Sequence, residues 1–320
     1  MEMFWGLFMS ALLLGCTYTL VAIGFSMFFG VMDVVVFCCG DIAIFGSFAI
    51  MGAYAAMQSA GLFAVLPFWV CVALLIIIGA VFCAALGLMT HLLSIKPFHN
   101  SSELMPLLST IAMGTVIKEI LGLLFKPAVN AVSKMVGGPD AMTVVSGRNP
   151  QAFPALLMPN GSVLSRNITI ILITAVMLLL LFLFLNRTKM GMSMQAISQN
   201  KELSRMTGIN VSKIVVITFL IGGVMLAISG FLLGSYQKLM SFDDGAMYGA
   251  KGFSAAVVGG LRNTWGAVIG GMLLAFVEVF VSGYIPRGTA YSSIVAFVVV
   301  VVFIVFRPEG IIGEKSVEKV

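Results

Sequence analysis

The sequence predicts an all-α membrane protein, a polytopic helical bundle of about 8–10 spans with an inverted repeat and broken helices. Of the 320 residues, 60% are hydrophobic and only 10% are charged, whereas a soluble domain carries about 25% charged residues. Long apolar runs recur along the chain, while β-barrel strands show only a weak alternation. Two similar glycine-containing breaks interrupt these runs and provide the third observation.

Nine apolar segments follow one another along the chain. They cover residues 3–30, 33–57, 62–94, 103–125, 167–186, 213–236, 247–261, 264–285 and 290–307. A spanning helix needs roughly 20 apolar residues, and two of the segments, 33–57 and 247–261, are interrupted by polar residues or glycine. No long polar stretch of low complexity separates them, so we expect a single transmembrane domain over residues 1–320.

The distribution of Lys and Arg predicts the orientation, because loops rich in these residues stay in the cytoplasm. They gather in the loop 187–212 and in the C-terminal tail (Arg187, Lys189, Lys201, Arg205, Arg307, Lys315 and Lys319). The loop 126–166 is also basic, which weakens the rule here. Counting spans back places the N-terminus outside and the C-terminus in the cytoplasm. Residues 3–125 and 213–307 then form two repeat halves of opposite topology.

The two breaks are similar to each other. "FCCGDIAIFGSFAIMGAYAA" begins at Phe37 and "FDDGAMYGAKGFSAAVVGG" begins at Phe242. Both open with F-x-x-G and place acidic residues beside the glycine. Irregular backbone survives inside a membrane only where protein or a water-filled cavity satisfies its polar groups. We therefore expect Gly40 and Gly245 to approach each other near the membrane midplane and to line a solute path. Asp41 is either a helix cap or a residue of that path.

The loop 187–212 contains signals for a short cytoplasmic helix of about two turns. Asn200 is a candidate N-cap, Glu202 lies in the first turn, and Gly208 is a candidate stop. Its apolar residues are available to dock on a partner (Leu203, Met206 and Ile209). The alternative is a solvated loop with one helical turn.

Other reactive residues give no catalytic or metal site. The five cysteines (Cys16, Cys38, Cys39, Cys71 and Cys83) lie in apolar surroundings and are expected to be small buried residues. The two histidines, His91 and His99, are not spaced as metal ligands with them. Lys118 and Glu119 are expected to snorkel or to form a local pair. Glu278 is explained equally well by a functional role and by an interhelical hydrogen bond. The net charge of +5 is spread over loops and ends, which does not indicate nucleic-acid binding.

Four stretches together resemble the permease subunits of branched-chain amino acid ABC transporters, of the LivH/LivM type and closer to LivH. "GCTYTLVAIGFSMFFG" (15–30) is similar to the family's G-x-T-Y-A-L-x-A-I-G opening. "QNKELSRMTGIN" (199–210) is similar to its cytoplasmic N-x-x-x-A-x-x-x-G-I segment. "FSAAVVGGLRNTWGAVIGGMLLAFVE" (253–278) and the ending "RPEGIIG" (307–313) resemble its glycine-rich run and its terminus.

The resemblance departs in two places. The family's usual N-F-A-H-G-E appears as "VFCCGD", which keeps Gly40 and an acidic residue at 41 but loses the asparagine and histidine. Arg262 stands where a glycine is usual. The first departure lies on the expected path and implies a shifted substrate preference. We place on that path Thr17 and Tyr18 of the opening together with the residues of the two breaks (Cys38, Cys39, Gly40, Asp41, Asp243, Asp244 and Gly245).

The resemblance implies an importer permease of the bacterial inner membrane that works by alternating access. Its implied partners are a second, LivM-like permease, two ATPase subunits and a periplasmic substrate-binding protein. The chain lacks the G-x-x-x-x-G-K-[ST] phosphate loop, so ATP is bound by the partners and no cofactor is expected here. The residues implied to couple to the ATPase lie in one segment (Asn200, Glu202, Leu203, Arg205, Met206 and Gly208).

Three alternatives stay open from the sequence. One is a related importer for amides, urea or sugars. The second is a stand-alone ion-coupled transporter, with candidate ion ligands among the acidic residues (Asp33, Asp41, Asp243, Asp244 and Glu278). The third is an intramembrane enzyme, which the scattered histidines and cysteines do not favour.

Overall fold

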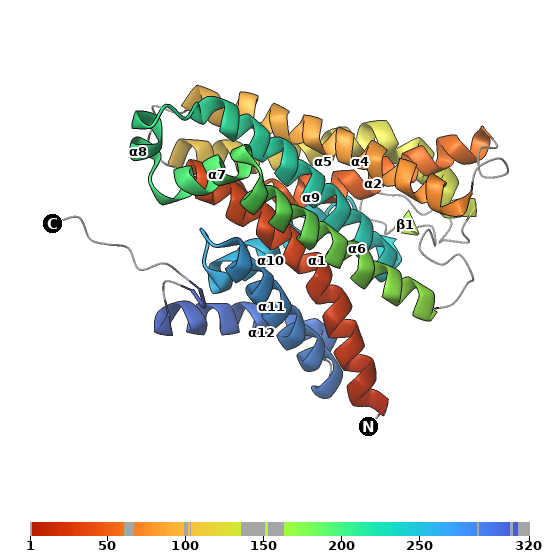
Figure 1. The fold of residues 1–320 in the computed structure, drawn as a ribbon. Coiled ribbons are helices and arrows are strands. Elements are labelled where there is room, and N and C mark those ends of the chain that lie inside the picture. Colours follow the sequence, from red (N-terminus) through yellow and green to blue (C-terminus); the bar gives the residue numbers. More distant parts are fainter. Residues whose placement is uncertain are drawn as a thin grey trace. The chain divides into compact units, whose positions relative to one another are not determined.

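The described part of the chain is almost entirely helical (Figure 1). The computed structural model describes residues 2–60, 67–98, 102, 104–135, 151–152, 163–286, 288–307 and 310–312. The helices are α1 (Glu2–Met32), α2 (Cys39–Ser59), α4 (Phe68–Thr90), α5 (Leu104–Met135), α6 (Val163–Arg187), α7 (Lys189–Gln199), α8 (Lys201–Met206), α9 (Val211–Gln237), α10 (Asp244–Gly259), α11 (Thr264–Tyr284) and α12 (Gly288–Phe306). A π-helical turn, His91–Ile95, and a 3-10 turn, Lys96–Phe98, follow α4.

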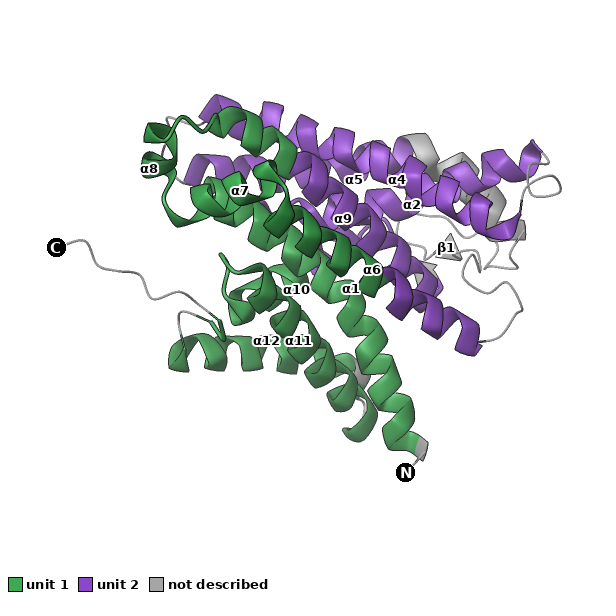
Figure 2. Cartoon of the chain, in the orientation of Figure 1, with its two compact units in different colours: residues 1–35, 174–218, 250–320 green, residues 36–173, 219–249 purple. Residues whose placement is uncertain are grey.

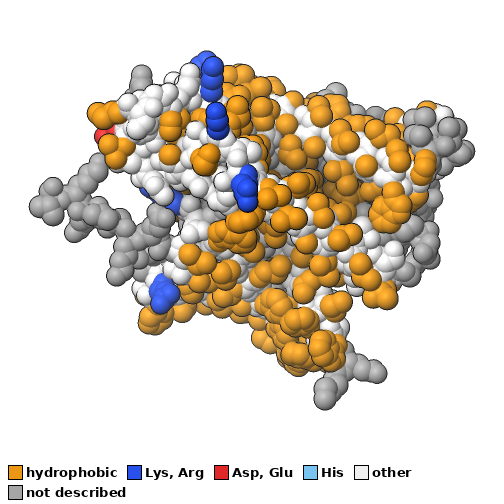
Figure 3. Space-filling view, viewed as in Figure 1, with side chains coloured by type: hydrophobic (Ala, Val, Ile, Leu, Met, Phe, Trp, Pro, Cys, Tyr) orange, Lys and Arg blue, Asp and Glu red, His pale blue; other side chains and the backbone are white. Residues whose placement is uncertain are grey.

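Each of the nine predicted apolar segments contains a helix. Seven helices among the described residues are long and apolar enough to cross a membrane, and α12 contributes a shorter apolar helix, Ala290–Phe306. Helix α10 has only 16 residues, fewer than the roughly 20 that a span needs. Figure 3 shows one face of the protein largely covered by hydrophobic side chains. The prediction of an all-α polytopic membrane protein is confirmed.

The two predicted breaks have the same local construction. Helix α1 ends at Met32 and is followed by Asp33 with φ 58°, while α9 ends at Gln237 and is followed by Lys238 with φ 64°. A left-handed backbone is uncommon for residues other than glycine. In both places the next helix begins six residues after the left-handed residue, at Cys39 and at Asp244. The left-handed residue and the start of the next helix therefore have the same spacing in both breaks, as in a repeat.

The described helices group into two compact units (Figure 2). Unit 1 contains Met1–Val35, Thr174–Thr218 and Ala250–Val320. In it, α1 packs along α11 and also contacts α7, and α11 packs against α12. The packing is close, since a methyl group on Gly271 would meet the backbone of Thr19 at 2.7 Å.

Unit 2 contains Val36–Ile173 and Phe219–Gly249. Helix α2 packs against α4 and α5, and the rings of Phe48 and Phe242 lie 4.6 Å apart. Two short antiparallel strands, β1 (Gln151–Ala152) and β2 (Leu239–Met240), pair within it.

Each unit draws on both predicted repeat halves. Unit 1 joins the first helix of the first half, α1, to the last helices of the second. Unit 2 joins the second part of α9 to the remaining helices of the first half. The boundaries of the halves, 3–125 and 213–307, thus differ from those of the compact units. The single domain over 1–320 stays a prediction.

Candidate functional site

The two breaks meet in unit 2, where Gly40 and Gly245 lie backbone against backbone. A methyl group on Gly40 would overlap the carbonyl oxygen of Gly245 and the backbone of Gly249. A methyl group on Gly245 would overlap the side chain of Asp41. Only glycine leaves space for so close an approach. The expectation that the residues around Gly40 and Gly245 approach each other is confirmed, and the F-x-x-G pattern has a steric reason.

Charged side chains from three elements surround this contact. Asp41 lies half-buried in the first turn of α2. Lys118 of α5 forms an ion pair with Asp243, which precedes α10, and it also attracts the carboxylate of Asp41. The side chains of Lys118 and Asp243 are 40% and 31% exposed, so the pair is accessible. The expectation of a local pair for Lys118 is wrong, because its partner comes from the other break.

Asp244 has a structural position at the start of α10. Its Oδ2 atom accepts a hydrogen bond of 2.7 Å from the backbone N–H of Ser241. A carboxylate in the first turn is also favoured by the positive end of the helix dipole. Of the two acidic residues in "FDDG", Asp244 therefore stabilises the break, and Asp243 forms the ion pair with Lys118.

Cys38 and Cys39 are fully buried beside the glycine contact. The sulfur of Cys38 lies 4.0 Å from Oγ1 of Thr90. One residue further, His91 begins the π-helical turn and stacks on Phe219 with 5.2 Å between ring centroids. Its Nδ1 atom is buried and has no hydrogen-bond partner among the described residues. Both cysteine side chains are therefore enclosed by protein atoms next to the glycine contact.

Thr17 and Tyr18, also placed on the expected path, belong to a second polar cluster in unit 1. The Thr17 hydroxyl donates to the carbonyl of Leu14 (2.7 Å). The Tyr18 hydroxyl donates to Oε2 of Glu278 (2.9 Å), which is an interhelical hydrogen bond of the kind considered for Glu278. Lys251 was not predicted as part of this cluster. Its Nζ lies 2.5 Å from Oε1 of Glu278 and 5.6 Å from the centre of the Tyr18 ring.

The predicted short helix in the 187–212 segment is confirmed as α8. The Oδ1 atom of Asn200 accepts hydrogen bonds of 3.1 Å from the backbone N–H groups of Glu202 and Leu203. Gly208 follows the helix with φ +83°, the left-handed C-terminal stop. The side chains of Leu203 and Met206 are 59% and 84% exposed, and Arg205 is exposed as well.

The same segment holds a helix that the sequence analysis did not predict. Helix α7 begins after Thr188, whose Oγ1 accepts a hydrogen bond of 3.0 Å from the backbone N–H of Gly191. A threonine N-cap was a visible signal. The sequence did not predict this helix because Gly191 and Ser193 of "MGMSMQ" have low helix propensity, which the packing of α7 against α1 overrides.

The acidic residues do not assemble as an ion site. Within the described part of the chain, no group of three or more His, Cys, Asp or Glu side chains is arranged to hold a metal ion. Asp33 pairs with Arg262, Asp243 with Lys118 and Glu278 with Lys251. Three of the five candidate ion ligands are therefore neutralised by basic side chains.

Comparison with known proteins decides the family. A family model described as "Branched-chain amino acid transport system / permease component" matches residues 7–304. The chain belongs to this family.

The permease is similar to curated relatives over nearly its whole length. It is 29% identical to LivH of Salmonella typhimurium, a high-affinity branched-chain amino acid transport permease, covering 96% of this chain and 94% of LivH. It is 29% identical to the equivalent BraD of Pseudomonas aeruginosa, covering 97% and 96%. A fructose import permease, FruF of Bifidobacterium longum, is 25% identical over 65% of this chain and 62% of its own. No solved structure matches the sequence.

Proposed function

We propose that this permease is the membrane-spanning subunit of an ABC importer for branched-chain or related hydrophobic amino acids. The observation that carries this is the full-length similarity to two branched-chain amino acid permeases, while the sugar permease matches a smaller part of the chain. The partners are a second, homologous permease, two ATPase subunits and a periplasmic substrate-binding protein. The complex resides in the bacterial inner membrane.

The solute path passes the contact between the two breaks. The charges there fit a zwitterionic solute, because Asp41 offers a carboxylate to an ammonium group and Lys118 offers an ammonium group to a carboxylate. Polar and ionisable residues inside a membrane are costly and are typical of substrate pathways. Alternating access would separate and close the tightly packed surfaces around Gly40 and Gly245 in each cycle.

The coupling surface is α8. Two large apolar side chains exposed on a short polar helix, Leu203 and Met206, are suited to a cleft of a partner protein. An amphipathic helix seated in a groove is a common mode of protein recognition. An ATPase subunit occupies this position, so that its ATP-driven movement acts on residues 187–212.

The orientation follows from this assignment. The coupling segment is cytoplasmic, the N-terminus is outside, and the two repeat halves have opposite topology. The C-terminal residues lie outside the described part of the chain, and their cytoplasmic location is also part of the proposal. Labelling with a membrane-impermeant thiol reagent in a cysteine-free background tests it: a cysteine at position 2 reacts only from the periplasmic side, and one at position 206 only from the cytoplasmic side.

Uptake by intact cells tests the substrate class. A strain without its own leucine, isoleucine and valine uptake is supplied with this permease and its partners, and radiolabelled leucine is followed. Excess valine or isoleucine should inhibit uptake, while fructose and urea should not. Uptake of labelled fructose or urea in place of leucine would assign the permease to one of the other importer classes.

A further inference from the structure

A single guanidinium joins three elements of unit 1. Nη2 of Arg262, in the turn between α10 and α11, lies 2.6 Å from Oδ1 of Asp33. Its Nη1 atom donates a hydrogen bond of 3.3 Å to the backbone carbonyl of Ser198. Asp33 directly follows α1, and Ser198 lies in the last turn of α7, two residues before the N-cap of α8.

Both partners of Arg262 are at the negative ends of helix dipoles. The last carbonyls of a helix lack intrahelical partners, and Ser198 is in this position on α7. A carboxylate at a helix C-terminus is unfavourable, and Asp33 follows the 31 residues of α1 with a left-handed backbone. Arg262 relieves both, because its positive charge faces two negative helix ends at once. The contact therefore depends on charge and on the geometry of the guanidinium fork.

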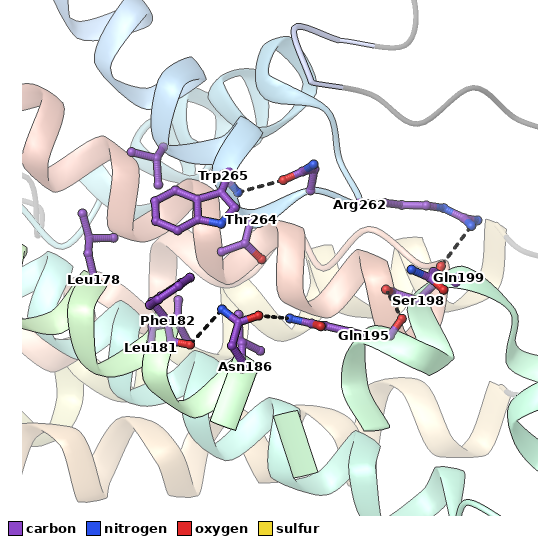
Figure 4. A pocket seen from close by; sticks show the side chains of 13 residues that line it. Leu178, Leu181, Phe182, Asn186, Gln195, Ser198, Gln199, Arg262, Thr264 and Trp265 are labelled. Carbon is purple, nitrogen blue, oxygen red and sulfur yellow. Dashed lines mark hydrogen bonds between the residues drawn. The ribbon is translucent and has the colours of Figure 1, made fainter. Parts of the chain in front are cut away.

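The guanidinium has free volume on two sides. Arg262 lines a cavity of about 210 Å³ beside α6 and α7, and a second cavity of about 60 Å³ beside α1. Figure 4 shows its side chain extended toward Ser198 and away from Trp265. Arg262 and Asp33 are also about half exposed. An ion pair of this kind is weak enough to form and break, and the side chain has room to change rotamer.

The turn that carries Arg262 is fixed to the end of α10. The backbone N–H of Gly260 donates to the carbonyl of Ala256 (2.9 Å), and that of Asn263 donates to the carbonyl of Gly260 (3.0 Å). Helix α10 is continuous from Asp244 to Gly259, about 24 Å at 1.5 Å per residue. Its first turn holds Gly245, which contacts Gly40. One helix thus connects Arg262 to the candidate site.

We propose that Arg262 is a positioning residue that transmits movement of the coupling segment to α1 and, through α10, to the glycine contact of the solute path. The inference rests on the proposed ATP-driven function. A displaced α8 pulls on α7, the Ser198 carbonyl moves with it, and the Arg262 link carries the displacement to the α10–α11 turn. Without the link, the ATPase cycle would proceed with less movement of the path.

The test is a double-mutant cycle on the complex assembled with its ATPase and binding-protein partners in proteoliposomes. The variants are Arg262→Gln, Asp33→Asn, both together and the conservative Arg262→Lys. Arg307→Gln, which removes an exposed arginine elsewhere in the same unit, is the matched control. Three quantities are measured for each: assembled complex, ATP hydrolysed, and leucine taken up per ATP.

We expect each single variant to lower uptake per ATP about two- to fivefold, which is the change in a two-state ratio that the loss of an exposed ion pair produces. ATP hydrolysis and complex yield should stay at the parental level. The double variant should be no worse than the singles, because residues acting through one contact are non-additive. Arg262→Lys, which keeps the charge but lacks the guanidinium fork, should recover only part of the loss, and Arg307→Gln should show none.

Two results would overturn the inference. One is unchanged uptake per ATP in Arg262→Gln. The other is a loss that follows complex yield or multiplies in the double variant, which would make Arg262 a structural residue only. Absence of ATP-driven uptake in the parental complex would instead refute the proposed function.

Discussion

Nζ of Lys251 lies 2.5 Å from Oε1 of Glu278 between α10 and α11, with the two side chains only 13% and 12% exposed. Tyr18 completes this cluster from α1. Removing one member of a buried ion pair leaves an uncompensated charge, which costs about 3–5 kcal/mol, whereas an apolar replacement of both is often neutral. Single and double substitutions in this cluster can therefore distinguish the contribution of charge pairing to stability from that of packing.

Glu278→Leu should strongly lower the thermal unfolding temperature of the detergent-purified permease, because Lys251 is left charged and buried. The double variant Lys251→Met with Glu278→Leu should recover most of that loss. Lys213→Met, at an exposed lysine near the start of α9, is the control and should change little. A double variant as unstable as the single would show that the cluster has a role other than charge compensation.

The glycine contact predicts a steric effect. Gly40→Ala and Gly245→Ala should each lower uptake and stability, because the added methyl group overlaps backbone or the Asp41 side chain. Gly122→Ala on α5 is the matched control, since a methyl group there meets nothing within 4 Å. That control should be neutral or stabilising, by about 0.5–1 kcal/mol. Parental uptake in both site variants would show that the added methyl groups are tolerated and that transport does not need this close helix contact.

Much of this arrangement was visible in the sequence, for a physical reason. Hydrophobic length and polar interruptions are local properties, so nine apolar segments and two breaks could be located from the sequence. The repeated F-x-x-G predicted that Gly40 and Gly245 meet, because equivalent broken helices in an inverted repeat approach one axis. The N-cap and stop of α8 are likewise encoded by neighbouring residues, Asn200 and Gly208.

The sequence did not show which charged residues pair with each other. Lys118 finds Asp243, and Lys251 finds Glu278, across long stretches of chain. Helical periodicity shows which segment a charge belongs to but not which helix it faces. The same limit explains Thr17 and Tyr18: a motif placed them on the path, while packing against α11 gives Tyr18 a partner in Glu278.

Asp41 should be required for transport but not for folding. It is half-buried, and the positive charge of Lys118 attracts its carboxylate. Among the described residues, Asp41 forms no ion pair. Asp41→Ala should reduce leucine uptake about ten- to hundredfold, the equivalent of a charged hydrogen bond of roughly 1.5–3 kcal/mol. Complex yield and unfolding temperature should stay close to parental. Loss of folded protein with uptake would identify Asp41 as a helix cap alone.

The coupling surface predicts an uncoupled phenotype. Leu203→Asp and Met206→Asp should abolish substrate-stimulated ATP hydrolysis in the assembled complex, because a charge replaces an apolar contact with the ATPase. The amount of permease in the membrane should not change, since both side chains are exposed. Met206→Leu, which keeps the apolar surface, should retain stimulation. Parental stimulation in both aspartate variants would place the ATPase contact elsewhere.

The most direct test of an ATP-driven importer permease is leucine accumulation in proteoliposomes that contain the permease with its second permease and ATPase subunits. The binding protein is supplied outside and ATP inside. We predict that accumulation requires the binding protein and hydrolysable ATP, and that a proton or sodium gradient cannot replace them. Accumulation by the purified permease alone, driven by an ion gradient, would contradict the account and identify a stand-alone ion-coupled transporter.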